Sequence, residues 1–118
     1  MDISNLNVKV GCDIVNIRRF KTLEKKFLLK IFHENEIKSK NPETIAGLFA
    51  AKESCRKAFN ELGWHDITIK KMRSGRPLLL IDLKKINEKI QIISSDLSIS
   101  HDGDYATAAA VFLVKFQK

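Results

Sequence analysis

The sequence has few cysteines and no long apolar run, and each shortage excludes a class of protein. Its only two cysteines, Cys12 and Cys55, stand apart from any Cys-x-x-Cys or Cys/His spacing, which argues against a structural zinc site. No apolar stretch approaches the roughly 18 residues that a membrane span needs. The first residues lack the basic start of a signal peptide. We therefore expect a cytoplasmic protein with reduced thiols and no membrane partner.

Repeats, linkers and low-complexity segments are also absent, so the 118 residues should form one domain, residues 1–118. The formal net charge of +7 indicates an anionic partner: nucleic acid, a phosphorylated cofactor or an acidic protein. The chain lacks the interleaved aromatics of a single-strand binder and any helix-turn-helix spacing. A basic nucleic-acid-binding module is therefore the less favoured hypothesis, and we expect no nucleic-acid partner.

The alternation of apolar and other residues over 8–14 predicts an early β-strand. The apolar members are Val8, Val10, Cys12 and Ile14. Such a strand is half-buried and carries Asp13 on its other face. Further strands are expected at 67–69, 78–83, 97–100 and 106–116, whereas 84–93 fits a helix better than alternation. The last strand is apolar on both faces, so the long helix or another subunit should cover each face.

A long helix is predicted over residues 42–62. Asn41 is a good N-cap, Pro42 suits the first helical position, and Gly63 is a plausible stop. Apolar residues recur along it at helical spacing. Lys52 falls inside this apolar stripe and Glu53 at its border.

Two carboxylates and the cations near them could form a metal site. Mg²⁺ takes oxygen ligands and is typically bound by one or two carboxylates plus substrate phosphates, which makes Asp13 and Glu53 candidates. Lysines beside them could contact the remaining phosphate oxygens. Ordinary alternatives stay open: Asp13 can cap a turn, Glu53 and Lys57 can pair along the helix, and Lys52 can extend its ammonium to water.

Other polar residues have weaker signals. His101 precedes an Asp-Gly-Asp turn, where side chains reach solvent or ligand, although an exposed loop histidine is equally ordinary. Arg76 is a possible phosphate contact in what could be a plain hairpin turn. Positive charge is concentrated just after Asp13, either as a solvated basic face or as a docking surface for an acidic protein. Its residues are Arg18, Arg19, Lys21, Lys25, Lys26 and Lys30.

Four motifs stand in series along the chain. They are Gly-x-Asp-Ile-x-x-Ile-x-Arg from Gly11, Phe-Ala-Ala-Lys-Glu-x-x-x-Lys from Phe49, Gly-x-Pro from Gly75, and Ser-x-Ser-His-x-x-x-Tyr-Ala from Ser98. Together they resemble the holo-[acyl-carrier-protein] synthase family, the small 4'-phosphopantetheinyl transferases. The resemblance implies an α+β fold of a single lobe, about half of the two-lobed transferases, with an antiparallel sheet packed on a long helix.

The resemblance also implies an activity: transfer of 4'-phosphopantetheine from coenzyme A to a serine of an acidic apo acyl carrier protein, with release of adenosine 3',5'-bisphosphate. It implies a homotrimer with sites between subunits. By position, Asp13 and Glu53 would hold Mg²⁺, with Glu53 and Lys57 catalytic. The expected coenzyme A contacts are Lys52, Lys57, Arg76, Pro77 and His101. The expected carrier-docking residues are Arg18 and Arg19.

Two departures from the family pattern stand out. Leu48 occupies the place of an arginine that usually precedes Phe-Ala-Ala-Lys-Glu, so Arg56 or Arg76 would have to supply that cationic contact with coenzyme A. The glycine-rich loop that usually follows the helix is shortened to residues 60–64, where Trp64 could substitute by stacking. An inactive relative that binds carrier protein is the alternative that Leu48 suggests.

Overall fold

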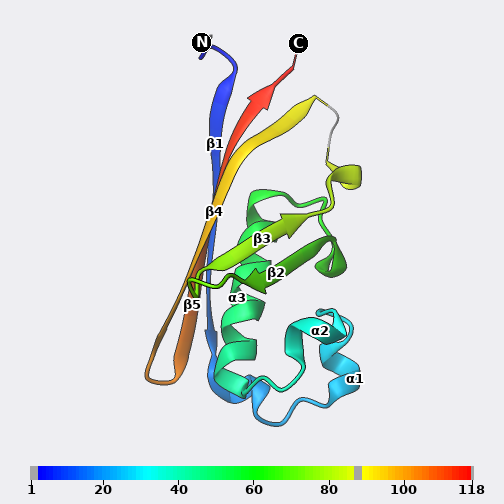
Figure 1. Cartoon of the computed structure of the whole chain (residues 1–118), viewed down its shortest axis with the longest axis vertical. Coiled ribbons are helices and arrows are strands. Elements are labelled where there is room, and N and C mark those ends of the chain that lie inside the picture. Colours follow the sequence, from blue (N-terminus) through cyan, green and yellow to red (C-terminus); the bar gives the residue numbers. More distant parts are fainter. Residues whose placement is uncertain (1–2, 87–88, 118) are drawn as a thin grey trace.

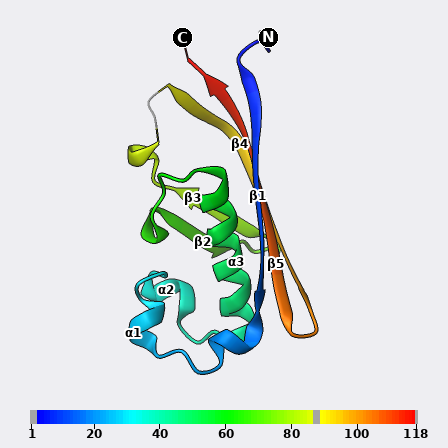
Figure 2. The ribbon, with the colours of Figure 1, turned by 180° about the vertical axis from the view of Figure 1, so that it is seen from behind.

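The computed structural model describes residues 3–86 and 89–117, and its largest feature is a three-stranded antiparallel sheet. In this sheet β1 (Leu6–Asn16) and β4 (Ile90–Asp102) flank the central β5 (Tyr105–Phe116). The long helix α3 (Pro42–Ala58) packs on one face of the sheet, as Figures 1 and 2 show from opposite sides.

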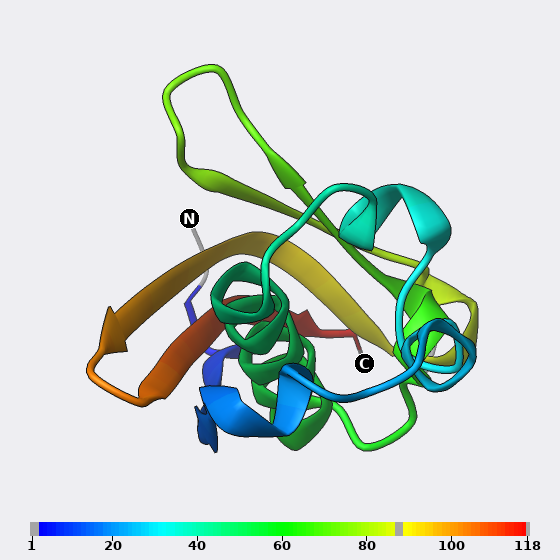
Figure 3. The ribbon, with the colours of Figure 1, turned by 90° about the horizontal axis from the view of Figure 1, so that it is seen from below.

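A separate hairpin lies beside β4. It consists of β2 (Ile67–Lys71) and β3 (Pro77–Ile81), which pair with each other and with no strand of the larger sheet in the described residues. The loop between them projects away from the molecule (Figure 3). The short helical segments are η1 (Ile17–Phe20), α1 (Lys25–Leu28), α2 (Glu34–Ile37), η2 (Trp64–Asp66) and η3 (Leu83–Lys85). No helix in the described part of the chain is both long and apolar enough to cross a membrane.

α3 begins where the sequence predicts and ends earlier. Asn41 accepts a hydrogen bond from the Thr44 N–H at 2.8 Å, and Pro42 occupies the first turn. The helix ends at Ala58 because Phe59 adopts an extended conformation and packs its ring against Phe112, with 5.0 Å between centroids. The predicted end at residue 62 is therefore wrong by four residues, because a contact with β5 outweighs the local stop signal.

Residues 84–93, whose ambiguous pattern favours a helix over alternation, do not form one in the described part of the chain. Leu83–Lys85 is a short 3-10 turn, residues 87 and 88 lie outside the described residues, and β4 already begins at Ile90. β4 spans 13 residues, against the four predicted. Its register with β5 shifts between Ile92 and Ser94, and this bulge interrupts the alternation that would have revealed a long strand.

The face of β1 that was predicted to be buried is exposed, and the other face packs against the helix. The apolar residues Val8, Val10 and Ile14 are 58%, 65% and 62% exposed, whereas Gly11 and Val15 face the helix and are buried. The inward face of β5 is apolar as expected, with Ala106, Ala108, Ala110, Phe112 and Val114 all buried. The outward face of the sheet is therefore an apolar surface that the single chain leaves uncovered.

α3 crosses this sheet diagonally, and two glycines mark its path. A side chain at Gly11 of β1 would overlap the backbone carbonyl of Ser54, in the C-terminal half of the helix. A Cβ at Gly47, in the N-terminal half, would come within 2.8 Å of Ile99 and His101 of β4. The helix thus runs from the β4 edge of the sheet to the β1 edge.

Candidate active site

Asp13 and Lys57 meet at the β1 edge. The Lys57 ammonium lies 3.2 Å from the Asp13 carboxylate and donates to the carbonyl of Cys12 at 2.9 Å. The Asp13 side chain is 15% exposed, so it is largely enclosed but reachable. The close approach at Gly11 makes this possible, because it brings the backbone of α3 against β1 two residues before Asp13.

Glu53 lies one helical turn before Lys57, but it pairs with a different cation. The Arg56 guanidinium contacts Oε1 of Glu53 at 3.2 Å, and the Glu53 side chain is 29% exposed. The alternative of a simple Glu53–Lys57 pair is therefore not what forms, since Lys57 engages Asp13. Glu53 and Lys57 are one turn apart on the same side of α3, and Asp13 contacts that side through Lys57.

The donor set suits one hard cation. No group of three or more His, Cys, Asp and Glu side chains that could hold a metal occurs within residues 3–86 and 89–117. Asp13 and Glu53 provide two partly exposed carboxylates from facing elements. Mg²⁺ is commonly bound by one or two carboxylates and completes its coordination with water and substrate phosphates. The residues present therefore fit that ion.

His101 lies at the other edge of α3. Its Nε2 is 3.0 Å from the carbonyl oxygen of Glu43, in the first turn of the helix. A cavity of about 740 Å³ opens beside it, and its lining includes Lys40, Leu48, Lys70, Lys71, Pro77 and His101. The walls combine apolar surface with lysines, as a site for an anionic organic ligand requires.

One chain does not bring the two halves of the predicted site together. Asp13 pairs across the sheet with Ala108, and Ala108 pairs in turn with Ile99 on β4. His101 lies two residues after Ile99 on β4, and β5 separates β4 from the strand β1 that carries Asp13. The Asp13, Glu53 and Lys57 cluster and the His101 cavity therefore occupy opposite edges of α3.

Lys52 is not a ligand contact, and the prediction that it binds coenzyme A is wrong. Its side chain is 0% exposed, and its ammonium donates to the carbonyls of Ile31 (3.0 Å) and Trp64 (3.1 Å). It also donates to the Glu36 carboxylate at 2.7 Å. Burial lowers the pKa of Lys52, and Glu36 opposes that shift. The ordinary alternative does not apply either, since the buried ammonium does not extend to water.

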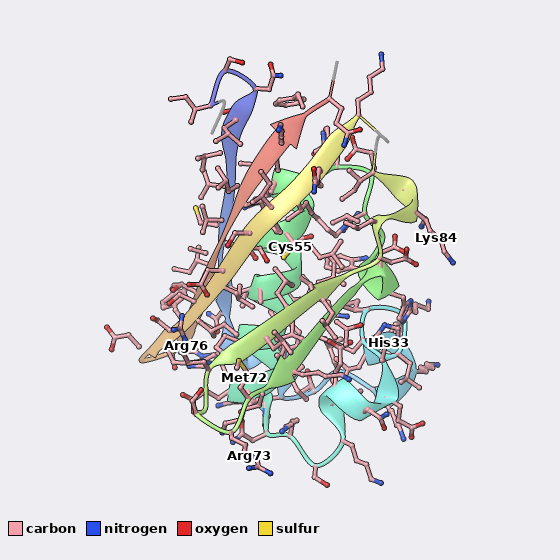
Figure 4. The ribbon with its side chains drawn as sticks, turned by 45° about the horizontal axis from the view of Figure 1, so that its top comes forward. His33, Cys55, Met72, Arg73, Arg76 and Lys84 are labelled. Atoms are coloured by element: carbon pink, nitrogen blue, oxygen red, sulfur yellow. The ribbon has the colours of Figure 1, made fainter. Side chains whose placement is uncertain are left out.

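Arg76 and Pro77 lie where the hairpin approaches β4. Nη2 of Arg76 lies 3.1 and 3.3 Å from the two carboxylate oxygens of Asp96, and Figure 4 shows Arg76 beside β4. Its side chain remains 65% exposed. Pro77 lines the cavity next to His101. Both residues are accessible to a ligand, although the Arg76 guanidinium already has an anionic partner.

The two candidate docking arginines are exposed on η1, just after β1. Arg18 contacts Asp104 at 3.0 Å and is 70% exposed. The Arg19 guanidinium lies 5.5 Å from the ring centroid of Phe49 and 5.9 Å from that of Phe20. Both arginines therefore lie on the surface that follows Asp13 in the chain.

Two residues shape the site in ways that the sequence did not predict. Glu36 is 6% exposed and pairs with Lys52, yet nothing in its local sequence indicates burial. Trp64 stacks against Arg56, 4.1 Å from the guanidinium carbon. The sequence indicates Trp64 as a stacking surface for a ligand, whereas in the structure Trp64 stacks on Arg56.

Known proteins resemble this chain over most of its length. Residues 9–110 match the sequence model of the 4'-phosphopantetheinyl transferase superfamily. A holo-[acyl-carrier-protein] synthase of Sulfurimonas denitrificans is 38% identical over 84% of this chain and 89% of its own length. One from Caldicellulosiruptor saccharolyticus is 40% identical over 86% of this chain and 93% of its own. The chain belongs to the holo-[acyl-carrier-protein] synthase family.

Solved structures of the holo-[acyl-carrier-protein] synthase family share this fold. The Helicobacter pylori enzyme in complex with coenzyme A matches with a TM-score of 0.74 and 37% identity, covering 87% of this chain and 98% of that one. The Chronobacterium ammoniagenes coenzyme A complex matches with a TM-score of 0.76 and 28% identity, over 95% and 99%. The α+β fold expected from the four motifs is thus confirmed.

Proposed function

We propose that this chain transfers the 4'-phosphopantetheine arm of coenzyme A to a serine of an apo acyl carrier protein and releases adenosine 3',5'-bisphosphate. The observation that carries the proposal is the grouping of Asp13, Glu53 and Lys57 at one edge of α3 in a chain of this family. Two carboxylates and a partly exposed lysine form a small clamp for a diphosphate.

The chemistry is displacement at the β-phosphorus of coenzyme A. The serine oxygen forms a bond to this phosphorus, the bond to the bridging oxygen of the diphosphate breaks, and the serine proton leaves to a base. Mg²⁺ held by Asp13 and Glu53 would neutralise diphosphate charge. Lys57 adds a point charge to the phosphate oxygens, and the candidate proton acceptors are Glu53 and a water bound to the metal. Positioning and charge stabilisation supply most of the rate.

The remainder of coenzyme A fits the cavity beside His101 and Pro77. Arg56 and Arg76, the expected replacements for the arginine that Leu48 displaces, are both engaged in ion pairs. Lys40, Lys70 and Lys71 line the cavity next to Leu48. These lysines are better placed to compensate the charge of coenzyme A.

A homotrimer with sites between subunits is part of the proposal. The clamp and the cavity lie at opposite edges of α3, so two chains side by side could supply one half each. The outward face of the sheet carries Val8, Val10 and Ile14, all more than half exposed. A contiguous apolar surface of this kind is usually buried against another molecule. The family resemblance makes the assembly cyclic and threefold.

The carrier protein should dock on the basic surface around η1 and α1. Phe27 is 44% exposed there, and the ammonium groups of Lys26 and Lys30 lie 5.3 and 5.2 Å from its ring centroid. An apolar centre surrounded by cations suits an acidic protein helix, and the exposed Arg18 and Arg19 extend the positive charge onto η1. A cytoplasmic location accords with the two free cysteines.

Intact-mass analysis of an apo carrier incubated with this chain, coenzyme A and Mg²⁺ tests the function. We expect the carrier to gain the mass of one phosphopantetheine. A carrier whose acceptor serine is replaced by alanine should gain nothing, and a chelator should prevent the reaction. No gain on a carrier that another family member modifies in parallel would favour the inactive relative instead.

A further inference from the structure

Arg56 makes more contacts than a surface salt bridge needs. Its Nη1 lies 3.2 Å from Oε1 of Glu53, its Nε donates to the carbonyl of Leu62 at 3.1 Å, and its guanidinium lies over the ring of Trp64. These partners belong to three segments: α3 itself, the loop after it, and η2. The side chain is 34% exposed, so it lies along the surface of the protein with its orientation restricted on three sides.

Trp64 is itself firmly held. Its ring stacks on Phe49, with 5.4 Å between centroids and 29° between planes. Its backbone carbonyl accepts a hydrogen bond from the buried ammonium of Lys52 at 3.1 Å. The surface beneath Arg56 is therefore fixed both through the ring and through the backbone.

We propose that Arg56 is a positioning residue for Glu53. By engaging Oε1 it restricts the carboxylate to one orientation before any cation arrives. Oε2 has no protein partner among the described residues, so it is the oxygen left for the metal. Carboxylates that bind metals are commonly hydrogen-bonded by neighbouring residues that orient them. This inference rests on the proposed metal role of Glu53.

The geometry favours positioning over a simple ion pair. Glu53 and Arg56 are spaced i,i+3, and a pair with both side chains about one-third exposed contributes little to folding. The bond to Leu62 and the stack on Trp64 do not strengthen that pair, but they remove rotamer freedom from Arg56. A planar guanidinium can make all three contacts at once, and a lysine ammonium cannot.

Binding of Mn²⁺ in the presence of coenzyme A, followed by electron paramagnetic resonance, tests this directly. We expect Arg56→Ala and Arg56→Lys to weaken Mn²⁺ binding about 10- to 100-fold, with thermal unfolding close to that of the unchanged chain. Trp64→Ala should weaken binding in the same direction, and Trp64→Phe should retain most of it. Trp64 is the only tryptophan, so its emission reports on the stack in each Arg56 variant.

Arg73→Ala is the matched control, because Arg73 is an exposed arginine in the loop between β2 and β3 (Figure 4). If Arg56→Ala leaves Mn²⁺ affinity unchanged or tightens it while Glu53→Ala abolishes binding, the positioning role is overturned and the metal assignment stands. If Glu53→Ala also leaves binding unchanged, the metal assignment fails and the role of Arg56 fails with it. The mass assay on the carrier decides the proposed function separately.

Discussion

Lys52 and Glu36 form an ion pair inside the protein, with 2.7 Å between Nζ and Oε1 and side chains that are 0% and 2% exposed. The Glu36 carboxylate also accepts the backbone N–H groups of His33 (2.8 Å) and Ile69 (3.0 Å). One carboxylate thus connects α2, β2 and α3. This pair holds the segment that carries the proposed docking surface against the helix that carries Glu53.

Removing one partner of this pair should be costly. Lys52→Met or Glu36→Gln should each destabilise the fold by about 3–5 kcal/mol, because the remaining polar group stays buried without its partner. The double variant should lose less than the sum of the two single variants. Urea unfolding followed by circular dichroism measures all three. Single-variant losses below about 1 kcal/mol, as for an exposed pair, would contradict this account.

Asp13→Ala and Glu53→Ala should each reduce phosphopantetheine transfer by orders of magnitude and leave folding nearly unchanged. Without either carboxylate the charge on the diphosphate is poorly neutralised. Transfer rates at limiting and at saturating Mg²⁺ provide the measurement. Glu61→Ala is the matched control, because Glu61 is exposed after the end of α3. Near-normal activity of both variants at limiting Mg²⁺ would rule out the metal assignment.

Arg19→Glu should raise the KM for the carrier protein and leave coenzyme A binding unchanged. Arg19 is exposed within the basic surface, and reversing its charge replaces attraction of an acidic partner by repulsion. Steady-state kinetics and calorimetric coenzyme A titrations separate the two effects. Lys84→Glu makes the same charge change at an exposed position of η3 (Figure 4). Equal losses for both substrates would indicate a folding defect or a role in coenzyme A binding.

Val10→Asp should give an inactive chain that does not assemble. Val10 is 65% exposed at the centre of the outward face of β1, and a buried unpaired carboxylate there would oppose contact between copies. Light scattering gives the mass of the assembly, and the transfer assay gives its activity. A fully active monomer would refute the trimer.

A mixing experiment tests the shared site within the same prediction. Asp13→Ala chains and His101→Ala chains should each be inactive alone, and unfolding and refolding them together should restore part of the activity. Sites with an intact Asp13 from one chain and an intact His101 from its neighbour would then exist. No recovery on mixing, with assembly intact, would place each complete site within one chain.

Asp66 should make stability depend on pH in the acidic range. The Gly63 N–H at 2.7 Å and then Lys85 at 3.0 Å lower the pKa of Asp66. Because the folded-state pKa lies below the unfolded value near 3.9, the stabilisation is present above that value and is lost as pH falls through the folded pKa. Asp66→Asn should therefore lower the Tm at pH 7 and match the unchanged chain at strongly acidic pH. Parallel temperature scans between these conditions measure the difference.

Local signals in the sequence predicted local features well. The start of α3 follows from Asn41 and Pro42, whose effects act within one turn. Its end depends on Phe59 packing against Phe112, which lies far away in the chain. Likewise, the helical pattern placed Lys52 on the apolar face, but its partner Glu36 is 16 residues earlier and no periodicity connects the two. Long-range contacts account for both errors.

Which face of β1 packs against the helix could not be predicted from the residues of β1 alone. Alternation identifies two faces, and the more apolar one was taken to meet the helix. In the structure Gly11 faces the helix because only a residue without a side chain allows α3 to come so close. The apolar residues are exposed instead, where a second chain could cover them. A pattern within one chain does not distinguish its own core from an interface.

The contact between Gly11 and Ser54 has a consequence for ion selectivity. Backbone atoms of β1 and α3 meet there directly, so no side-chain rotamer can change the spacing between the two elements. The separation of the Asp13 and Glu53 backbones is then set by the fold, in a space of nearly constant width. Mg²⁺ requires oxygens at about 2.0–2.1 Å, whereas Ca²⁺ needs 2.3–2.6 Å and more ligands. A metal site spanning these two elements can adapt only through the rotamers of its two carboxylate side chains, which favours the ion that needs fewer protein ligands.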